Sequence, residues 1–125
     1  MDERAVAAAV AEQAGLAKEE AADLIRATLE ALGKQLSGGE VRELAVDLPE
    51  GLASHLPQRK GGARPVPLSD FVRQLSQRTG LKEDEVTRGV RAFLTTLGRE
   101  PGSTHLQHAL SQLPAEYRQL ATTTA

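Results

Sequence analysis

Apolar residues recur three or four positions apart along most of this chain, a spacing that places them on one face of an α-helix. The longest of these stripes predict helices over roughly 3–14, 18–36, 69–79 and 83–99. Shorter stripes follow over 41–48 and 106–113. The apolar residues are mostly Ala, Leu and Val, and the aromatic residues that sheets favour are scarce. We therefore expect an all-α fold.

The ends of the stripes carry residues that typically begin or end helices. Gly15 and Gly80 are expected to end the first helix of each half, because glycine tolerates the left-handed conformation found there. Ser69 is expected to cap the start of the helix that follows it. Ser37 and Glu40 have the spacing of a capping box, in which hydroxyl and carboxylate each accept a backbone N–H.

The second half of the sequence repeats the first without a gap, at an offset of 65 positions. The identical pairs include Gly15 with Gly80, Leu29 with Leu94, and Pro49 with Pro114. Each proline stands at the expected first position of a short fourth helix, where its missing N–H costs nothing. The duplication predicts two tandem four-helix units, related by pseudo-twofold symmetry and packed as one helical bundle.

Changes in composition set the boundaries between these units. We assign helical repeat 1 to residues 1–56, a basic Pro/Gly linker to 57–68, helical repeat 2 to 69–121 and a frayed tail to 122–125. Each unit is marginal for independent folding, because a domain this small buries little apolar surface. We therefore expect the two repeats to pack face to face as a single domain.

Gly89 stands in the middle of a predicted helix, at the position where the first unit has Leu24. Glycine costs about 1 kcal/mol relative to alanine in a helix interior. A close helix crossing with no room for a side chain would explain it, and a tolerated surface glycine is the alternative. Gly89 is therefore a candidate helix-crossing position.

Composition and charge narrow the range of functions. The chain has no cysteine, which excludes a disulfide framework and thiolate chemistry and fits a cytoplasmic protein. It shows no signal-peptide pattern and no apolar run long enough to span a membrane. A formal net charge of −2, with only two phenylalanines and one tyrosine, argues against a general nucleic-acid binder with base-stacking surfaces.

His105 and His108 lie three positions apart on a predicted helix and can share one face. Zinc takes three or four ligands, whereas the equivalent positions of the first unit hold Glu40 and Glu43. We interpret the histidines as a solvated surface pair, with metal ligation as the alternative. The sequence contains no nucleophile constellation, phosphate-binding loop or dinucleotide motif. We therefore expect no enzymatic activity, no catalytic residue and no cofactor.

The basic cluster of the chain lies in the linker and consists of Arg59, Lys60 and Arg64. A flexible basic segment can contact phosphate groups or an acidic partner, with an affinity that falls as salt rises. These three residues are the candidates for anion or nucleic-acid contact, and a plain soluble linker is the alternative.

A pattern of Gly-Leu, an acidic helix start, Leu-Gly, Ser-Gly-Gly and Leu-Pro is carried by residues 15–20, 32–33, 37–40, 48–50 and 113–118. Over nearly the whole chain, it resembles the bacterial domain-of-unknown-function family numbered 2267. The second copy departs from the pattern at 101–104, where Ser-Gly-Gly is lost. The resemblance implies a small all-helical protein and supplies no catalytic or binding residues.

The segment from Val6 to Leu36 is also similar to the opening helical hairpin of histone-like bacterial DNA-binding proteins. In that family the hairpin builds the dimer core, and basic β-arms that follow it hold the DNA. More helix follows Ser37 here, with no basic arm. The likeness implies a mode of helix pairing rather than DNA binding.

These observations together favour a non-enzymatic protein-interaction or scaffold module. We expect it to bind a protein partner, or a second copy of itself, through an apolar groove between the units. A nucleic-acid-associated protein that uses the basic linker is the alternative, and a binder of a small apolar ligand is the second alternative.

Overall fold

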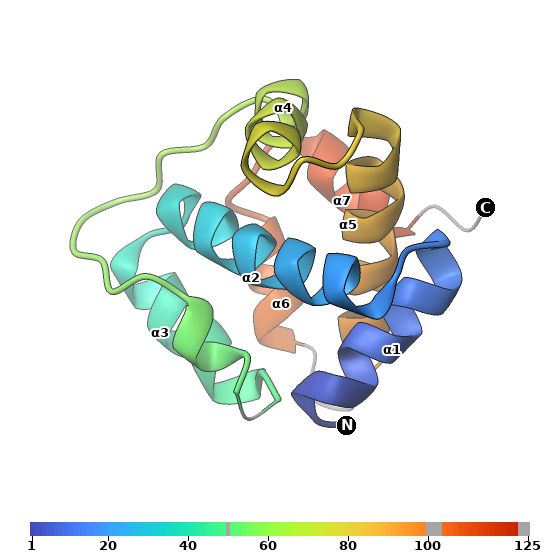
Figure 1. Ribbon diagram of the computed structural model, residues 1–125. Helices are drawn as coiled ribbons and strands as arrows, with labels where there is room; N and C mark the ends of the chain where they lie inside the picture. Colours follow the sequence, from blue (N-terminus) through green and yellow to red (C-terminus); the bar gives the residue numbers. More distant parts are fainter. Residues whose placement is uncertain (50, 100–103, 123–125) are drawn as a thin grey trace.

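The computed structural model describes residues 1–49, 51–99 and 104–122, and these contain α-helices, one short 3-10 turn and no strand (Figure 1). The all-α prediction is confirmed. The elements are α1 (Glu3–Ala14), α2 (Lys18–Gln35), α3 (Gly38–Asp47), η1 (Ala53–His55), α4 (Leu68–Thr79), α5 (Glu83–Gly98), α6 (Thr104–Leu110) and α7 (Ala115–Thr122).

The helices of the two halves interleave. The first helix of each half packs on the second helix of the other, so that α1 lies against α5 and α4 against α2 (Figure 1). The equivalent helices α2 and α5 contact one another, as do α3 and α6. If each helix were replaced by its equivalent in the other half, the same set of helix contacts would result. The pseudo-twofold axis itself stays a prediction.

One hydrophobic cluster runs through both halves. The largest fully buried side chains include Phe71, Phe93 and Tyr117, which are also the aromatic residues of the chain. Phe71 and Tyr117 meet edge to face, with ring centroids 5.4 Å apart and an interplanar angle of 64°. This geometry is the one that aromatic pairs prefer, and it joins α4 to α7 within the second half.

Gly89 is buried where α5 packs on α2. A Cβ atom at this position would overlap Cδ2 of Leu24 and lie 3.3 Å from Cδ1 of Leu16. The leucine of the first half therefore occupies the space that a side chain on its equivalent residue would need.

The glycines expected to end the first helix of each half do so. Gly15 has φ 69° and Gly80 has φ 79°, both in the left-handed region. The amide of Gly80 donates to the carbonyl of Ser76 over 2.9 Å. The capping residues were predicted less well, because several of them are set by contacts between the halves.

The capping box at Ser37 forms only in part. Ser37 Oγ accepts the amide of Glu40 over 3.2 Å, as predicted. The Glu40 carboxylate does not return to the amide of Ser37, because it faces His108 on α6 instead. The amide of Ser37 donates to Oε1 of Gln112 over 3.2 Å, so the second half completes the cap.

Three predicted helix ends are wrong. Ser69 is not a cap, because α4 begins one residue earlier and the amide of Leu68 donates to Oε1 of Glu116 over 2.8 Å. Pro49 does not begin a fourth helix; a turn with Gly51 at φ 96° follows it, and then only the 3-10 turn η1. The helix expected to reach residue 113 ends at Leu110. Thr122, assigned to the frayed tail, belongs to α7, and 123–125 lie outside the described residues.

Candidate functional site

A groove of about 700 Å³ lies on one side of α3. Its floor is apolar and includes Val41, Ala45 and Leu56, and its rim carries Arg42, Arg59 and Lys60. The remaining lining residues are Gly38, Ala53, Ser54, Pro57, Gln58. Among the described residues that line it, three carry positive charge and none is a carboxylate. We refer to it below as the α3 groove.

The second half has a hollow at the equivalent positions, with a volume of about 300 Å³. Ala45 of the α3 groove corresponds to Leu110, and Ala53 corresponds to Arg118. The Arg118 guanidinium donates to the carbonyls of Leu110 and Leu113, each over 3.2 Å. These larger side chains account for the smaller hollow, so the two halves differ at a place where both have a cleft.

The three basic linker residues do not form one surface. Arg59 directs its guanidinium to the carbonyls of Lys34 (2.8 Å) and Leu36, and thereby satisfies the C-terminal end of α2. Arg59 and Lys60 line the α3 groove, whereas Arg64 lines a separate hollow. Backbone bonds also fix the linker, since the amide of Arg64 donates to the carbonyl of Gln35 over 2.7 Å.

The hollow that contains Arg64 lies between the units, where α2 faces α4, and has a volume of about 260 Å³. Arg78 closes one side of it and donates to Oε2 of Glu30 over 2.6 Å. This hydrogen bond and the charge of Arg78 lower the pKa of Glu30 below its ordinary value. The same hydrogen bond, with the charge of Glu30, raises the pKa of Arg78. A hollow therefore lies between the units, but it is smaller than the α3 groove, and its lining includes Lys34, Arg64 and Arg78 rather than being apolar as expected.

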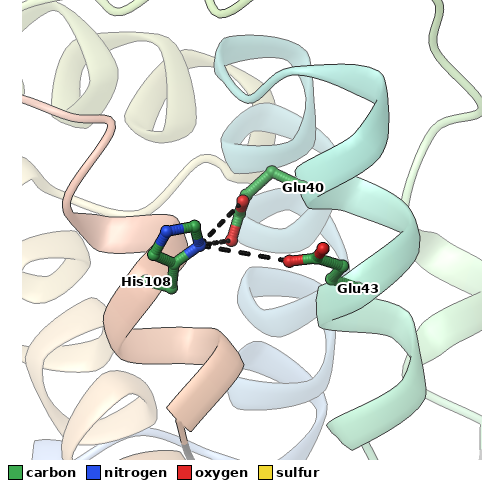
Figure 2. Close-up of side chains that lie close together, drawn as sticks. All are labelled: Glu40, Glu43 and His108. Atoms are coloured by element: carbon green, nitrogen blue, oxygen red, sulfur yellow. Dashed lines mark hydrogen bonds and ion pairs between the residues drawn. The ribbon is translucent and has the colours of Figure 1, made fainter.

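The opposite side of α3 faces α6. There, Glu40 and Glu43 of α3 form a cluster with His108 of α6 (Figure 2). Nδ1 of His108 lies 3.0 Å from each carboxylate oxygen of Glu40 and 4.0 Å from Oε2 of Glu43. The Glu40 side chain is 5% exposed, whereas those of Glu43 and His108 are 54% and 65% exposed. We refer to these three residues as the Glu–Glu–His cluster.

His105 lies apart from this cluster and pairs with Asp47. Its Nδ1 is 2.7 Å from Oδ2 of Asp47, and its amide donates to the same oxygen over 3.3 Å. Asp47, near the end of α3, thus holds the start of α6, as Gln112 beyond α6 holds Ser37 at the start of α3. The structure therefore separates the two histidines, with His108 in the cluster and His105 in an ion pair.

Comparison with known families shows a match to a family described as "Uncharacterized conserved protein (DUF2267)", over residues 4–120. The chain belongs to this family. The DUF2267 match spans both halves and the linker between them. A search of curated proteins finds no match. In the part of the chain that the structure describes, no helix has the length and apolar character needed to cross a membrane.

The DUF2267 resemblance, stated above from sequence alone, is thus confirmed, and it assigns no site. Sequence reasoning named Glu43 only as the residue that replaces His108 in the first half, and it named Glu40 as the residue that replaces His105 and as part of a capping box with Ser37. It did not place them beside His108. The duplication could have predicted this placement, because a helix that packs on the equivalent helix of the other repeat brings equivalent positions together.

Proposed function

We propose that this protein is a non-enzymatic interaction module that binds an acidic, amphipathic helical segment of a partner protein in the α3 groove. The observation that carries the proposal is the charge of the groove, whose described lining holds three cations and no carboxylate beside an apolar floor. An amphipathic helix places its apolar face in such a groove, and acidic residues flanking that face meet the rim.

The groove is held in shape before any partner arrives. The guanidinium of Arg59 is fixed on the C-terminal carbonyls of α2, and the amide of Gly38 donates to the carbonyl of Gly61 over 3.0 Å. A Cβ on Gly38 would overlap the carbonyl oxygen of Arg59, so the linker backbone packs directly on α3. Walls that are already ordered lower the entropic cost of binding.

The same contacts weigh against the nucleic-acid alternative. The guanidinium of Arg59 already donates to backbone carbonyls, and Arg64 lines a different hollow. The rim then offers Arg42 and Lys60 to a phosphate backbone, and two cations give only weak, salt-sensitive binding. The third possibility is a small apolar ligand, which would contact only the apolar floor of the α3 groove and would make no use of the cations on its rim.

A designed peptide tests the proposal. A fluorescein-labelled helix of about 15 residues, with leucine on one face and glutamate on the other, is titrated with the protein at low salt. We expect saturable binding, measured by anisotropy, that Arg42→Glu weakens about tenfold. Arg42 is exposed, so its replacement is expected to leave the fold intact.

Arg4→Glu is the matched control, because it makes the same charge change on an exposed residue of α1 that does not line the groove. We expect it to bind the peptide as the unmodified protein does. Equal weakening by both variants, or equal binding of a peptide with lysine in place of glutamate, contradicts the proposal. Binding of duplex DNA in place of the peptide at low salt favours the nucleic-acid alternative.

A further inference from the structure

We propose that Glu40, Glu43 and His108 form a binding site for one divalent first-row transition-metal ion, for which Zn²⁺ is the probe. Two carboxylates and one imidazole supply the oxygen and nitrogen donors that such ions take. With no cysteine in the chain, sites of this mixed kind are the ones it can build. Of the common divalent ions, Zn²⁺ binds such donors more tightly than Mn²⁺ or Fe²⁺.

The geometry is close to that of a three-ligand site. One potential ligand atom from each residue can be chosen so that all lie within 4.8 Å of one another. Two ligands bound to zinc at about 2.1 Å stand roughly 3.3 Å apart in a tetrahedral arrangement. Nδ1 of His108 is 3.0 Å from Glu40 and 4.0 Å from Glu43, so small side-chain rotations would complete the arrangement. Figure 2 shows both carboxylates directed to the same ring nitrogen.

The burial of Glu40 is an independent reason to expect a cation here. Its carboxylate is almost fully removed from water, and burying a carboxylate is costly unless it is paired. Within the described parts of the chain, His108 is the partner of that carboxylate. Two carboxylates carry a charge of −2, which a protonated imidazole only half offsets. A divalent ion bound to a neutral imidazole would offset it fully.

The ligands come from both halves of the chain, with Glu40 and Glu43 on α3 and His108 on α6. The Glu–Glu–His cluster therefore differs from the acidic first turns of α2 and α5, where neighbouring carboxylates belong to one helix and face water. A bound ion would join α3 to α6. It would stabilise the folded chain, in which the three ligands are assembled, over the unfolded chain, in which they are not.

Titration with zinc chloride tests this site. The protein is first treated with a chelator and dialysed, and heat release and melting temperature are then measured as zinc is added. We expect one ion per chain and a rise in melting temperature. We expect Glu43→Gln and His108→Gln each to weaken binding at least about tenfold. The side chains of both residues are more than half exposed, so these variants are expected to fold.

The chain offers a matched control in the pair of His55 and Glu3, whose Nε2 and Oε1 atoms lie 3.1 Å apart with no third ligand among the described residues. His55→Gln removes a histidine paired with a glutamate and is expected to leave zinc binding unchanged. The proposal is overturned if zinc releases no heat and does not shift the melting temperature. It is also overturned if both cluster variants bind as the unmodified protein does, or if His55→Gln abolishes binding.

Discussion

Gly89→Leu is expected to lower the free energy of unfolding by about 3 kcal/mol, at the upper end of the range for overpacked cores. The first atom of any side chain at this position already overlaps Cδ2 of Leu24 and lies 3.3 Å from Cδ1 of Leu16, so these core side chains would have to shift to admit a leucine. Leucine is a much better helix former than glycine, which would add stability at an exposed site. A measured loss would therefore identify the helix crossing as the cause. Urea unfolding followed by circular dichroism gives the number.

Alanine at two glycines of α5 provides the matched comparison. A Cβ at Gly98 meets no atom of the described residues within 4 Å, whereas one at Gly89 overlaps Leu24. We expect Gly89→Ala to destabilise the protein and Gly98→Ala to leave its stability unchanged or slightly raised. If both alanine variants are equally stable, the explanation from a close crossing is wrong.

A double variant extends the test to the relation between the halves. Leu24 and Gly89 are equivalent residues of the two repeats and face each other in the structure. Combining Leu24→Gly with Gly89→Leu places the same two residues at the crossing with their helices exchanged. If a pseudo-twofold axis passes here, the double variant recovers most of the stability that the single changes lose. Additive losses would argue against that axis.

Alkaline pH is expected to destabilise the protein by about 2 to 3 kcal/mol through Tyr117. Burial raises the pKa of this phenol to about 12, an effect that the charges of Glu116 and Asp70 support and the hydrogen bond with Gln35 partly opposes. The unfolded chain loses the phenolic proton near pH 10, whereas the folded chain keeps it. The contribution of the Tyr117 phenol to the free energy of unfolding is therefore fully present below about pH 10 and is lost as pH rises towards 12.

Tyr117→Phe separates this effect from other alkaline titrations. The hydroxyl donates to the carbonyl of Val66 over 2.8 Å and bonds with Gln35, so its loss is expected to cost about 1 to 2 kcal/mol at neutral pH. The stability gap between the two proteins should then shrink as pH rises from about 10 to about 12. Tyr117 is the sole tyrosine and the chain has no tryptophan, so tyrosinate absorbance reports this residue directly. A midpoint near pH 10 in the folded protein would contradict the prediction.

The fold could be predicted from the sequence because its signals are local. The apolar stripes give α1, α2, α4 and α5 to within about two residues, and Gly15 and Gly80 mark two helix ends. Predictions failed where a distant residue changed the local outcome. The carboxylate of Glu40 leaves its expected cap for His108, and Glu116 replaces Ser69 as the acceptor at the start of α4.

The candidate sites were harder to predict for the same physical reason. Arg59 was recognised as basic, but its role at the end of α2 depends on how the linker folds back over that helix. The α3 groove exists because Ala45 and Ala53 are small where the second half has Leu110 and Arg118. That contrast was visible in the aligned halves, yet only the packing shows that all four positions border a hollow.

The interleaving of the halves has a consequence for the order of events during synthesis. When α1 and α2 leave the ribosome, their packing partners α5 and α4 have not yet been translated. A nascent chain that ends before residue 98 can pack α1 on α2 but lacks the complete α5, so the apolar residues that face α5 in the folded protein are uncovered, a condition that makes partly made proteins prone to aggregate. The core shared by the two halves can therefore close only near the end of translation.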